Sequence, residues 1–171
     1  MILKRNTIVP IFLLCISLSS CGYRFAGSGS FPAGIKSVCI PILKNLTSEA
    51  GIANTITNDL IYEVTRRDIA VLSNKDEADS ILSGVIKSMT IETISRIDPQ
   101  TSSERRVTVT VNLKLTSHSG KIVRSIKGLS DYEEYDVVTD ELETEQNRRD
   151  AISNLSKRLA EKVYARITED F

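Results

Sequence analysis

The chain has 171 residues, with 22 basic and 22 acidic side chains and a net charge of zero at pH 7. This length suits one domain with a sizeable core, and the lack of an overall positive charge argues against nucleic-acid binding. The chain has a single histidine and three cysteines; if Cys15 is removed and Cys21 is modified, as argued below, one thiol remains, which is too few ligands for the usual kinds of zinc site.

The first twenty residues have the three parts of a secretory signal. Lys4 and Arg5 form a positive start, residues 8–18 are almost wholly apolar, and two serines follow. As a helix the apolar stretch would be roughly 16 Å long, which is too short for a hydrocarbon core of about 30 Å. We therefore predict that residues 1–20 are a signal peptide that is removed.

Cys21 ends the stretch Leu-Ser-Ser-Cys, which resembles the lipobox of bacterial lipoproteins. The resemblance implies that the Cys21 thiol receives a diacylglycerol, that cleavage occurs just before it, and that the new amine takes another acyl chain such as palmitate. Two or three acyl chains hold a protein on a membrane far more firmly than one. Gly22 stands where an Asp would imply retention in the inner membrane of enteric-type bacteria, so outer-membrane sorting is expected. The alternative is a plain signal peptide with a chance cysteine.

Residues 21–33 are rich in Gly and Ser, which predicts a tether between the lipid and the domain. The domain is expected to occupy residues 34–171. Its first predicted strand, residues 35–40, ends at Pro41.

A helix is predicted over residues 49–66, because Ile52, Ile56, Leu60 and Val64 recur every four residues. Ser48 is suited to cap its start. A second short strand is predicted at residues 69–72. A strand, a helix and a strand so close together predict a right-handed crossover with parallel strands.

The middle of the chain predicts long strands. Over residues 78–97, alternation places four apolar residues on one face, and Gly84 inside the strand indicates a bulge or a close approach. The four are Ile81, Val85, Met89 and Ile91. A turn-rich connection is expected at residues 98–103.

The clearest alternation in the chain covers residues 106–115, where apolar and polar residues strictly alternate. This pattern predicts an antiparallel strand with one buried face and one wet face. Residues 117–120 are expected to form a hairpin turn, and residues 121–135 the return strand.

Residues 140–169 are predicted to be helical, with an apolar stripe from Ile152 to Ile167. The polar part, residues 142–150, could be a solvated helix or a loop. The elements together predict an α/β two-layer sandwich: a mixed β-sheet of four to five strands with two helices packed on one face.

No set of residues suited to catalysis emerges. The single histidine, His118, lies in the predicted hairpin turn, and no known nucleophile, zinc-protease or phosphate-loop spacing occurs. The acidic run at residues 140–145 lacks the spacing of a calcium loop. We therefore predict a binding or structural protein that is not an enzyme and has no cofactor or metal.

Two features suggest contact with partners. Basic residues on the wet face and ends of the long strands could pair with phosphates or belong to an ordinary charged surface; they are Arg96, Arg105, Arg106, Lys114, Lys121, Arg124 and Lys127. Tyr132 and Tyr135 lie in an acidic segment and could form a protein interface or pack under the sheet.

The order of several short motifs resembles the LptE family of lipopolysaccharide-assembly lipoproteins. They are Cys21-Gly22-Tyr23-Arg24-Phe25, Phe31-Pro32, Ile35-Lys36-Ser37-Val38, Ile40-Pro41, Asn45-Leu46-Thr47, Leu60-Ile61-Tyr62-Glu63 and Ala78-Asp79-Ser80-Ile81-Leu82-Ser83-Gly84-Val85-Ile86, followed by an amphipathic C-terminal helix. Each motif is weak alone, and together they cover nearly the whole mature chain.

The resemblance implies a Gram-negative outer-membrane lipoprotein on the periplasmic face, held one to one inside the lumen of the LptD β-barrel. It would plug and help assemble that barrel, and the pair would insert lipopolysaccharide into the outer leaflet. The candidate lipopolysaccharide contacts are then Arg96, Arg105, Arg106, Arg124 and Lys127. A lipoprotein adaptor that activates a cell-wall synthase is the alternative, and a lipid-anchored enzyme is a weaker one.

Overall fold

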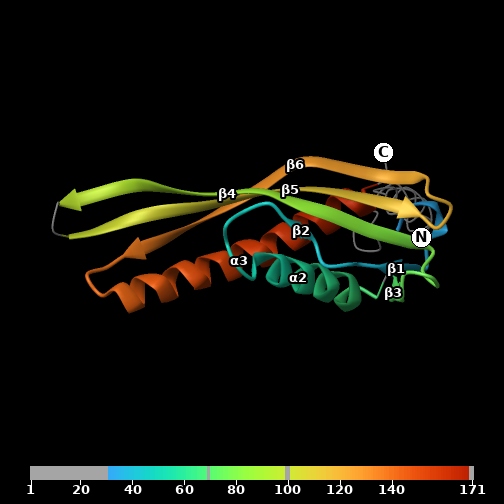
Figure 1. Ribbon diagram of the computed structural model, residues 1–171, viewed down its shortest axis with the longest axis horizontal. Helices are drawn as coiled ribbons and strands as arrows, with labels where there is room; N and C mark the ends of the chain where they lie inside the picture. The colour runs from blue at the N-terminus through green and yellow to red at the C-terminus, as the bar shows by residue number, and fades with distance from the viewer. Residues whose placement is uncertain (1–30, 69, 99–100, 170–171) are drawn as a thin grey trace, which may run out of the picture.

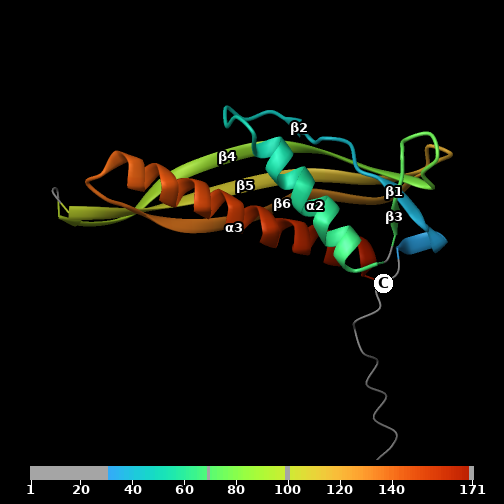
Figure 2. The same cartoon turned by 90° about the horizontal axis from the view of Figure 1, so that it is seen from below.

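The computed structural model describes residues 31–68, 70–98 and 101–169. Within these ranges the protein has two layers, a long twisted sheet and two helices that both lie on one face of it (Figure 1; Figure 2). The α/β two-layer sandwich predicted from the sequence is confirmed. The predicted signal segment, Cys21 and most of the tether lie outside the described residues.

The N-terminal part supplies the parallel portion of the sheet. After a short 3-10 turn, η2 (Pro32–Gly34), β1 (Ser37–Cys39) pairs in parallel with β3 (Val71–Leu72), and α2 (Ile52–Arg66) connects them. The predicted strand–helix–strand unit with parallel strands is therefore confirmed. β2 (Lys44–Asn45) adds a further parallel strand, so the sheet has six strands where four to five were expected.

α2 begins later than predicted, directly after Gly51, which has a φ of 83°. Ser48 is therefore not its cap. Side chains hold the preceding segment in a turn: the backbone N–H of Thr47 donates to Asn45 Oδ1 (2.9 Å), and that of Glu49 donates to Thr47 Oγ1 (3.2 Å). Such local bonds offer the backbone an alternative to helix, so the helix starts only after them.

Three long antiparallel strands form the rest of the sheet: β4 (Ser80–Asp98), β5 (Thr101–Ser117) and β6 (Ile122–Val137). The sheet order is β3-β1-β4-β5-β6, and β2 pairs with β4. β5 extends farther than predicted at both ends, and it already begins inside the expected connection 98–103. The expected hairpin turn follows β5, where the N–H of Gly120 donates to the carbonyl oxygen of Ser117 (2.9 Å).

The core lies between the sheet and the helices. In β5, every second residue from Val107 to Leu115 is at most 1% exposed, as the alternation predicted. These side chains pack against apolar residues of both helices, among them Leu60 in α2 and Leu155 in the C-terminal helix. The sequence pattern thus identified the buried face of the central strand.

The predicted facing of β4 was wrong for its first half. Leu82 and Ile86 are buried, whereas Ile81 and Val85 are not. Met89 nevertheless packs against the core, because the register with β5 shifts just after Ile86. An extra residue at such a bulge moves the following side chains to the other face.

Gly84 marks a close approach. A Cβ there would lie 2.9 Å from the carbonyl oxygen of Asn112 and 3.0 Å from Cδ2 of Leu43. The register shift of β4 lies farther along the strand, so the bulge that was the other expectation does not occur at Gly84. The missing side chain leaves room for Leu43 to enter the core.

α3 (Glu141–Thr168) covers β6 and part of β5. Its polar first third is helical, which settles the choice between helix and loop. Asp140 caps the helix by accepting hydrogen bonds from the N–H groups of Leu142 (2.8 Å) and Glu143 (3.4 Å). Between the helices, the hydroxyl of Ser156 donates to Asp59 Oδ2.

The far ends of β4 and β5 extend beyond both helices (Figure 1). We call the outer part of this hairpin, residues 91–98 and 101–106, the arm; its inner residues Ser103 to Arg106 still pair with β6. Ile91 and Ile94 are 42% and 37% exposed, because no helix lies beneath them. Ile91 lies opposite Val107 of β5, so it faces the helix side of the sheet as Met89 does, and its side chain is exposed there.

Candidate binding surfaces on the long strands

The face of the sheet opposite the helices is polar. In β5, Thr108, Thr110 and Asn112 alternate with core residues, and the register sets Ser88 and Thr90 of β4 beside the two threonines. We call this surface the bare face. It consists of Ser83, Val85, Ser88, Thr90, Glu92, Arg106, Thr108, Thr110, Asn112, Lys114, Ser125, Ser130, Tyr132 and Glu134.

Arg106 lies on the bare face near the base of the arm. Its Nη2 is 2.6 Å from Glu134 Oε1, and its guanidinium carbon is 4.5 Å from the centre of the Tyr132 ring. The hydrogen bond from Arg106 to Glu134 is the main cause that raises the pKa of the guanidinium. Stacking on an aromatic ring leaves the edge of a guanidinium free to donate, so this cluster can still contact an anion.

Arg105 points to the other side of the sheet. It is opposite Tyr135 in β6 and opposite Thr93 in β4, and it is half-buried. Arg96 lies on β4 within the arm, paired with Ser103; its side chain lies outside the described residues. The arm therefore carries two adjacent arginines on opposite faces.

Arg124 and Lys127 lie near the other end of the sheet. Arg124 is opposite Leu115 and faces the helices, where its Nη2 donates to the carbonyl oxygen of Glu169 (3.2 Å). Measured along β5 at about 3.3 Å per residue, it is roughly 33 Å from Arg105. The structure thus does not bring the five candidate basic residues into one site.

The two tyrosines have different environments. Tyr135 is 6% exposed and belongs to the core, whereas Tyr132 is 51% exposed on the bare face. Of the two interface candidates, Tyr132 alone is accessible. The Tyr135 hydroxyl has no hydrogen-bond partner within the described part of the chain.

Charged residues join α3 to β6. Arg158 contacts Asp131 (3.3 Å) and Glu133 (2.7 Å), and it donates to the carbonyl oxygen of Tyr132. Lys162 Nζ is 3.0 Å from Asp131 Oδ1. Burial would raise the pKa of Asp131, but the hydrogen bonds from Lys162 and from the Tyr132 N–H hold it below its usual value. This network fixes the helix to the sheet and leaves no free carboxylate for catalysis at that point.

No group of three metal-binding side chains occurs in residues 31–68, 70–98 and 101–169. Over the same ranges, no helix has both the length and the apolar character needed to cross a membrane. His118 is exposed in its turn, with Nδ1 3.3 Å from the carbonyl oxygen of Ala78. The surfaces described are suited to binding.

Sequence reasoning did not consider Lys44, which also points to the bare face. Lys44 pairs with Val85, and its neighbour Leu43 is buried on the opposite side. A strand of two residues leaves no alternation to detect, so only the parallel pairing reveals this placement.

Residues 35–167 match the model of the family described as LptE, lipopolysaccharide-assembly. The chain belongs to the LptE family. The match covers both helices and all six strands, so the whole described fold is that of an LptE domain. No curated protein sequence matches this LptE chain.

Solved structures of lipoproteins share the LptE fold. Lipoprotein B of Nitrosomonas europaea superposes with a TM-score of 0.58 at 14% identity, covering 86% of this chain and 90% of that one. A minor lipoprotein of Acinetobacter baumannii gives a TM-score of 0.53 at 18% identity, covering 78% and 91%. At such low identity the likeness concerns the fold alone.

Proposed function

We propose that this LptE-family protein is an outer-membrane lipoprotein that occupies an LptD-type β-barrel, plugs it and helps it to assemble. The pair would insert lipopolysaccharide into the outer leaflet. The observation that carries the proposal is the family match over residues 35–167. The lipobox-like sequence at Cys21 supports an anchor on the periplasmic face, and a polar surface on the bare face suits a barrel lumen.

The arm is the proposed region of lipopolysaccharide contact. It carries Arg105 on the helix side of the sheet, where the exposed Ile91 also lies, and Arg106 on the bare face; Ile94 is exposed as well. Lipopolysaccharide carries phosphates and acyl chains, so a surface with both basic and apolar side chains matches its chemistry. Arg96 lies on the same arm and is proposed as a third basic contact.

The partner is tested by recovery from membranes. The protein would be tagged at its C-terminus, outer membranes extracted in mild detergent, and bound proteins identified by mass spectrometry. We expect a stoichiometric β-barrel of LptD type that resists high salt. Recovery of a cell-wall synthase, or of no partner, would overturn the proposal and favour the adaptor alternative.

Lipopolysaccharide contact is tested by reversing the charge of the arm. R105E/R106E should weaken lipopolysaccharide binding to the purified protein, because two attractive groups become repulsive. K75E/K157E changes the net charge equally at exposed lysines away from the arm and is the control. Equal affinity of R105E/R106E and wild type would exclude the arm as the contact.

A further inference from the structure

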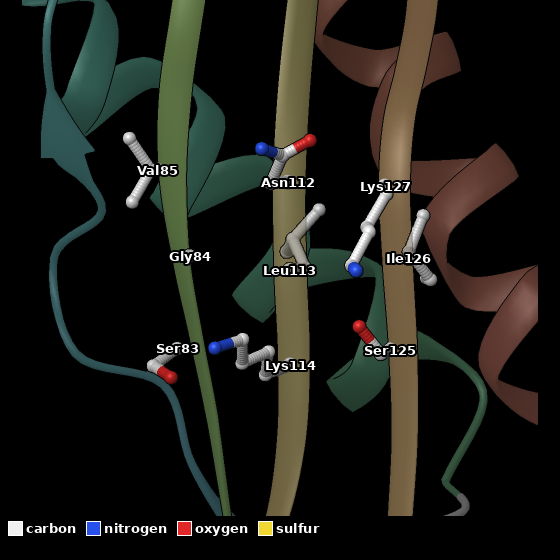
Figure 3. Close-up of a pocket in the computed structure, with 9 residues that line it drawn as sticks. All are labelled: Ser83, Gly84, Val85, Asn112, Leu113, Lys114, Ser125, Ile126 and Lys127. Atoms are coloured by element: carbon white, nitrogen blue, oxygen red, sulfur yellow. The ribbon is translucent and has the colours of Figure 1, made fainter.

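A hollow of about 450 Å³ lies on the bare face, well away from the arm (Figure 3). Lys114 of β5 and Lys127 of β6 border it, and both side chains extend over it in Figure 3. Lys44 of β2 flanks it, because its register partner Val85 is one of the lining residues. Two amines from neighbouring strands therefore border the hollow, and a third lysine lies on the next strand beside it.

A bulge in β6 places Lys127 there. Val111 pairs with Leu129 and Leu113 pairs with Ile126, so two residues of β6, Lys127 and Gly128, stand opposite Asn112 alone. The N–H of Gly128 donates to Asn112 Oδ1 (2.7 Å), and Gly128 has a φ of 64°, which suits glycine. Bulges of this kind redirect side chains, and here the redirected side chain is a cation.

The positive charge of the hollow has no counter-charge of its own. No Asp or Glu lines it, and in the part of the chain that the structure describes none of the three lysines makes an ion pair. Arg106, on the same face, is by contrast paired with Glu134 at 2.6 Å. Like charges on neighbouring strands repel each other, so an anion between them would relieve that repulsion.

The other lining groups indicate what carries the anion. Ser83 and Ser125 supply hydroxyls, Asn112 supplies an amide whose nitrogen can donate, and Val85 supplies apolar surface. Lysine amines bind phosphate as point charges. Hydroxyl and amide groups beside apolar carbon suit the hydroxyls and C–H faces of a sugar, and the volume is that of a small-ligand pocket.

We propose that the hollow bordered by Lys114 and Lys127, with Lys44 beside it, binds a phosphate carried on a sugar. One possible ligand is the phosphorylated sugar of lipopolysaccharide, and in that case the inference rests on the proposed function and adds a binding site to it. A soluble sugar phosphate is the other source with the same chemistry. The site is separate from the arm, so the protein would have two anion-binding regions at different points along the sheet.

The test uses the lipidated full-length protein in detergent and follows its amide resonances by NMR. N-Acetylglucosamine 1-phosphate should shift the amides of Asn112, Lys127 and Gly128 in a saturable way, whereas N-acetylglucosamine without phosphate should not. K114Q/K127Q should bind at least about ten-fold more weakly, since each charge-assisted hydrogen bond contributes about 1.5–3 kcal/mol. K75Q/K157Q is the matched control and should bind as wild type does. Both pairs of lysines are exposed, so neither variant should disturb folding.

Equal affinity of K114Q/K127Q and wild type, or shifts confined to the arm, would overturn the proposal. If K114Q/K127Q retains less lipopolysaccharide than wild type, the ligand is lipopolysaccharide. If it retains as much lipopolysaccharide but no longer binds the sugar phosphate, the ligand is a soluble sugar phosphate. Barrel recovery is measured separately. If the barrel is recovered but the hollow binds no sugar phosphate, this inference alone is wrong. If the hollow binds the sugar phosphate but no barrel is recovered, the proposed function alone is wrong.

Discussion

Tyr132 and Tyr135 show that the position of a residue along a strand determines whether its side chain is exposed or buried. They are three residues apart, so alternation puts them on opposite faces of β6, one stacked beneath Arg106 and the other in the core. Their aromatic character alone could not separate these roles. The opposite facing follows from their odd spacing once both residues are placed in one strand.

Adding a single methyl group at Gly84 should lower the stability of the protein. G84A adds a Cβ that would contact Asn112 O at 2.9 Å and Leu43 Cδ2 at 3.0 Å, and overpacking of this kind costs about 1–3 kcal/mol. Urea denaturation should show a lower free energy of unfolding. In the double variant with L43A, the loss should be smaller than the sum of the two single losses. A G84A protein as stable as wild type would contradict the close packing described.

Among the elements, β5 was predictable from sequence and β4 was only partly so. Strict alternation over residues 106–115 of β5 reports one buried face, whereas β4 changes face at the shift after Ile86. Bulges depend on the partner strand, so one strand's sequence does not reveal them. For the same reason the hollow at Lys114 and Lys127 could not be foreseen, because it requires the bulge opposite Asn112 and the short pairing of β2.

The contribution of the N-terminal cap of α3 to stability can be tested at Asp140. D140A removes the acceptor for the N–H groups of Leu142 and Glu143, and loss of such a cap costs about 1 kcal/mol. The melting temperature and the free energy of unfolding should both fall. D140N keeps an acceptor oxygen and should retain most of the stability; equal losses in the two variants would argue against capping as the cause.

For the whole molecule, the ion pairs within α3 and between α3 and β6 predict acid sensitivity. Hydrogen bonds from Arg148 and then Arg149 lower the pKa of Glu145 to about 2 from 4.5, and Arg148 also contacts Glu49 (2.8 Å). The pKa of Asp131 is lowered as well. Because the folded state holds these protons less tightly than the unfolded chain does, stability is full above about pH 4.5 and declines as the pH falls toward 2.

Chemical denaturation at pH 7, 5, 4 and 3 measures this decline. E145Q removes one of the titrating groups, so its free energy of unfolding should change less between pH 5 and pH 3 than that of wild type. Identical slopes in the two proteins would show that Glu145 makes no contribution to the acid sensitivity.

The long hairpin of β4 and β5 determines the length of the molecule. β4 contains 19 residues, a span of roughly 60 Å at about 3.3 Å per residue, which is twice a hydrocarbon core of about 30 Å. β1 pairs with the first residues of β4, so the N-terminal side of the domain and the tip of the arm lie at opposite ends of that span. In the proposed barrel, a domain standing upright from a lipid attachment in the periplasmic leaflet would therefore have a hairpin long enough to reach the other leaflet.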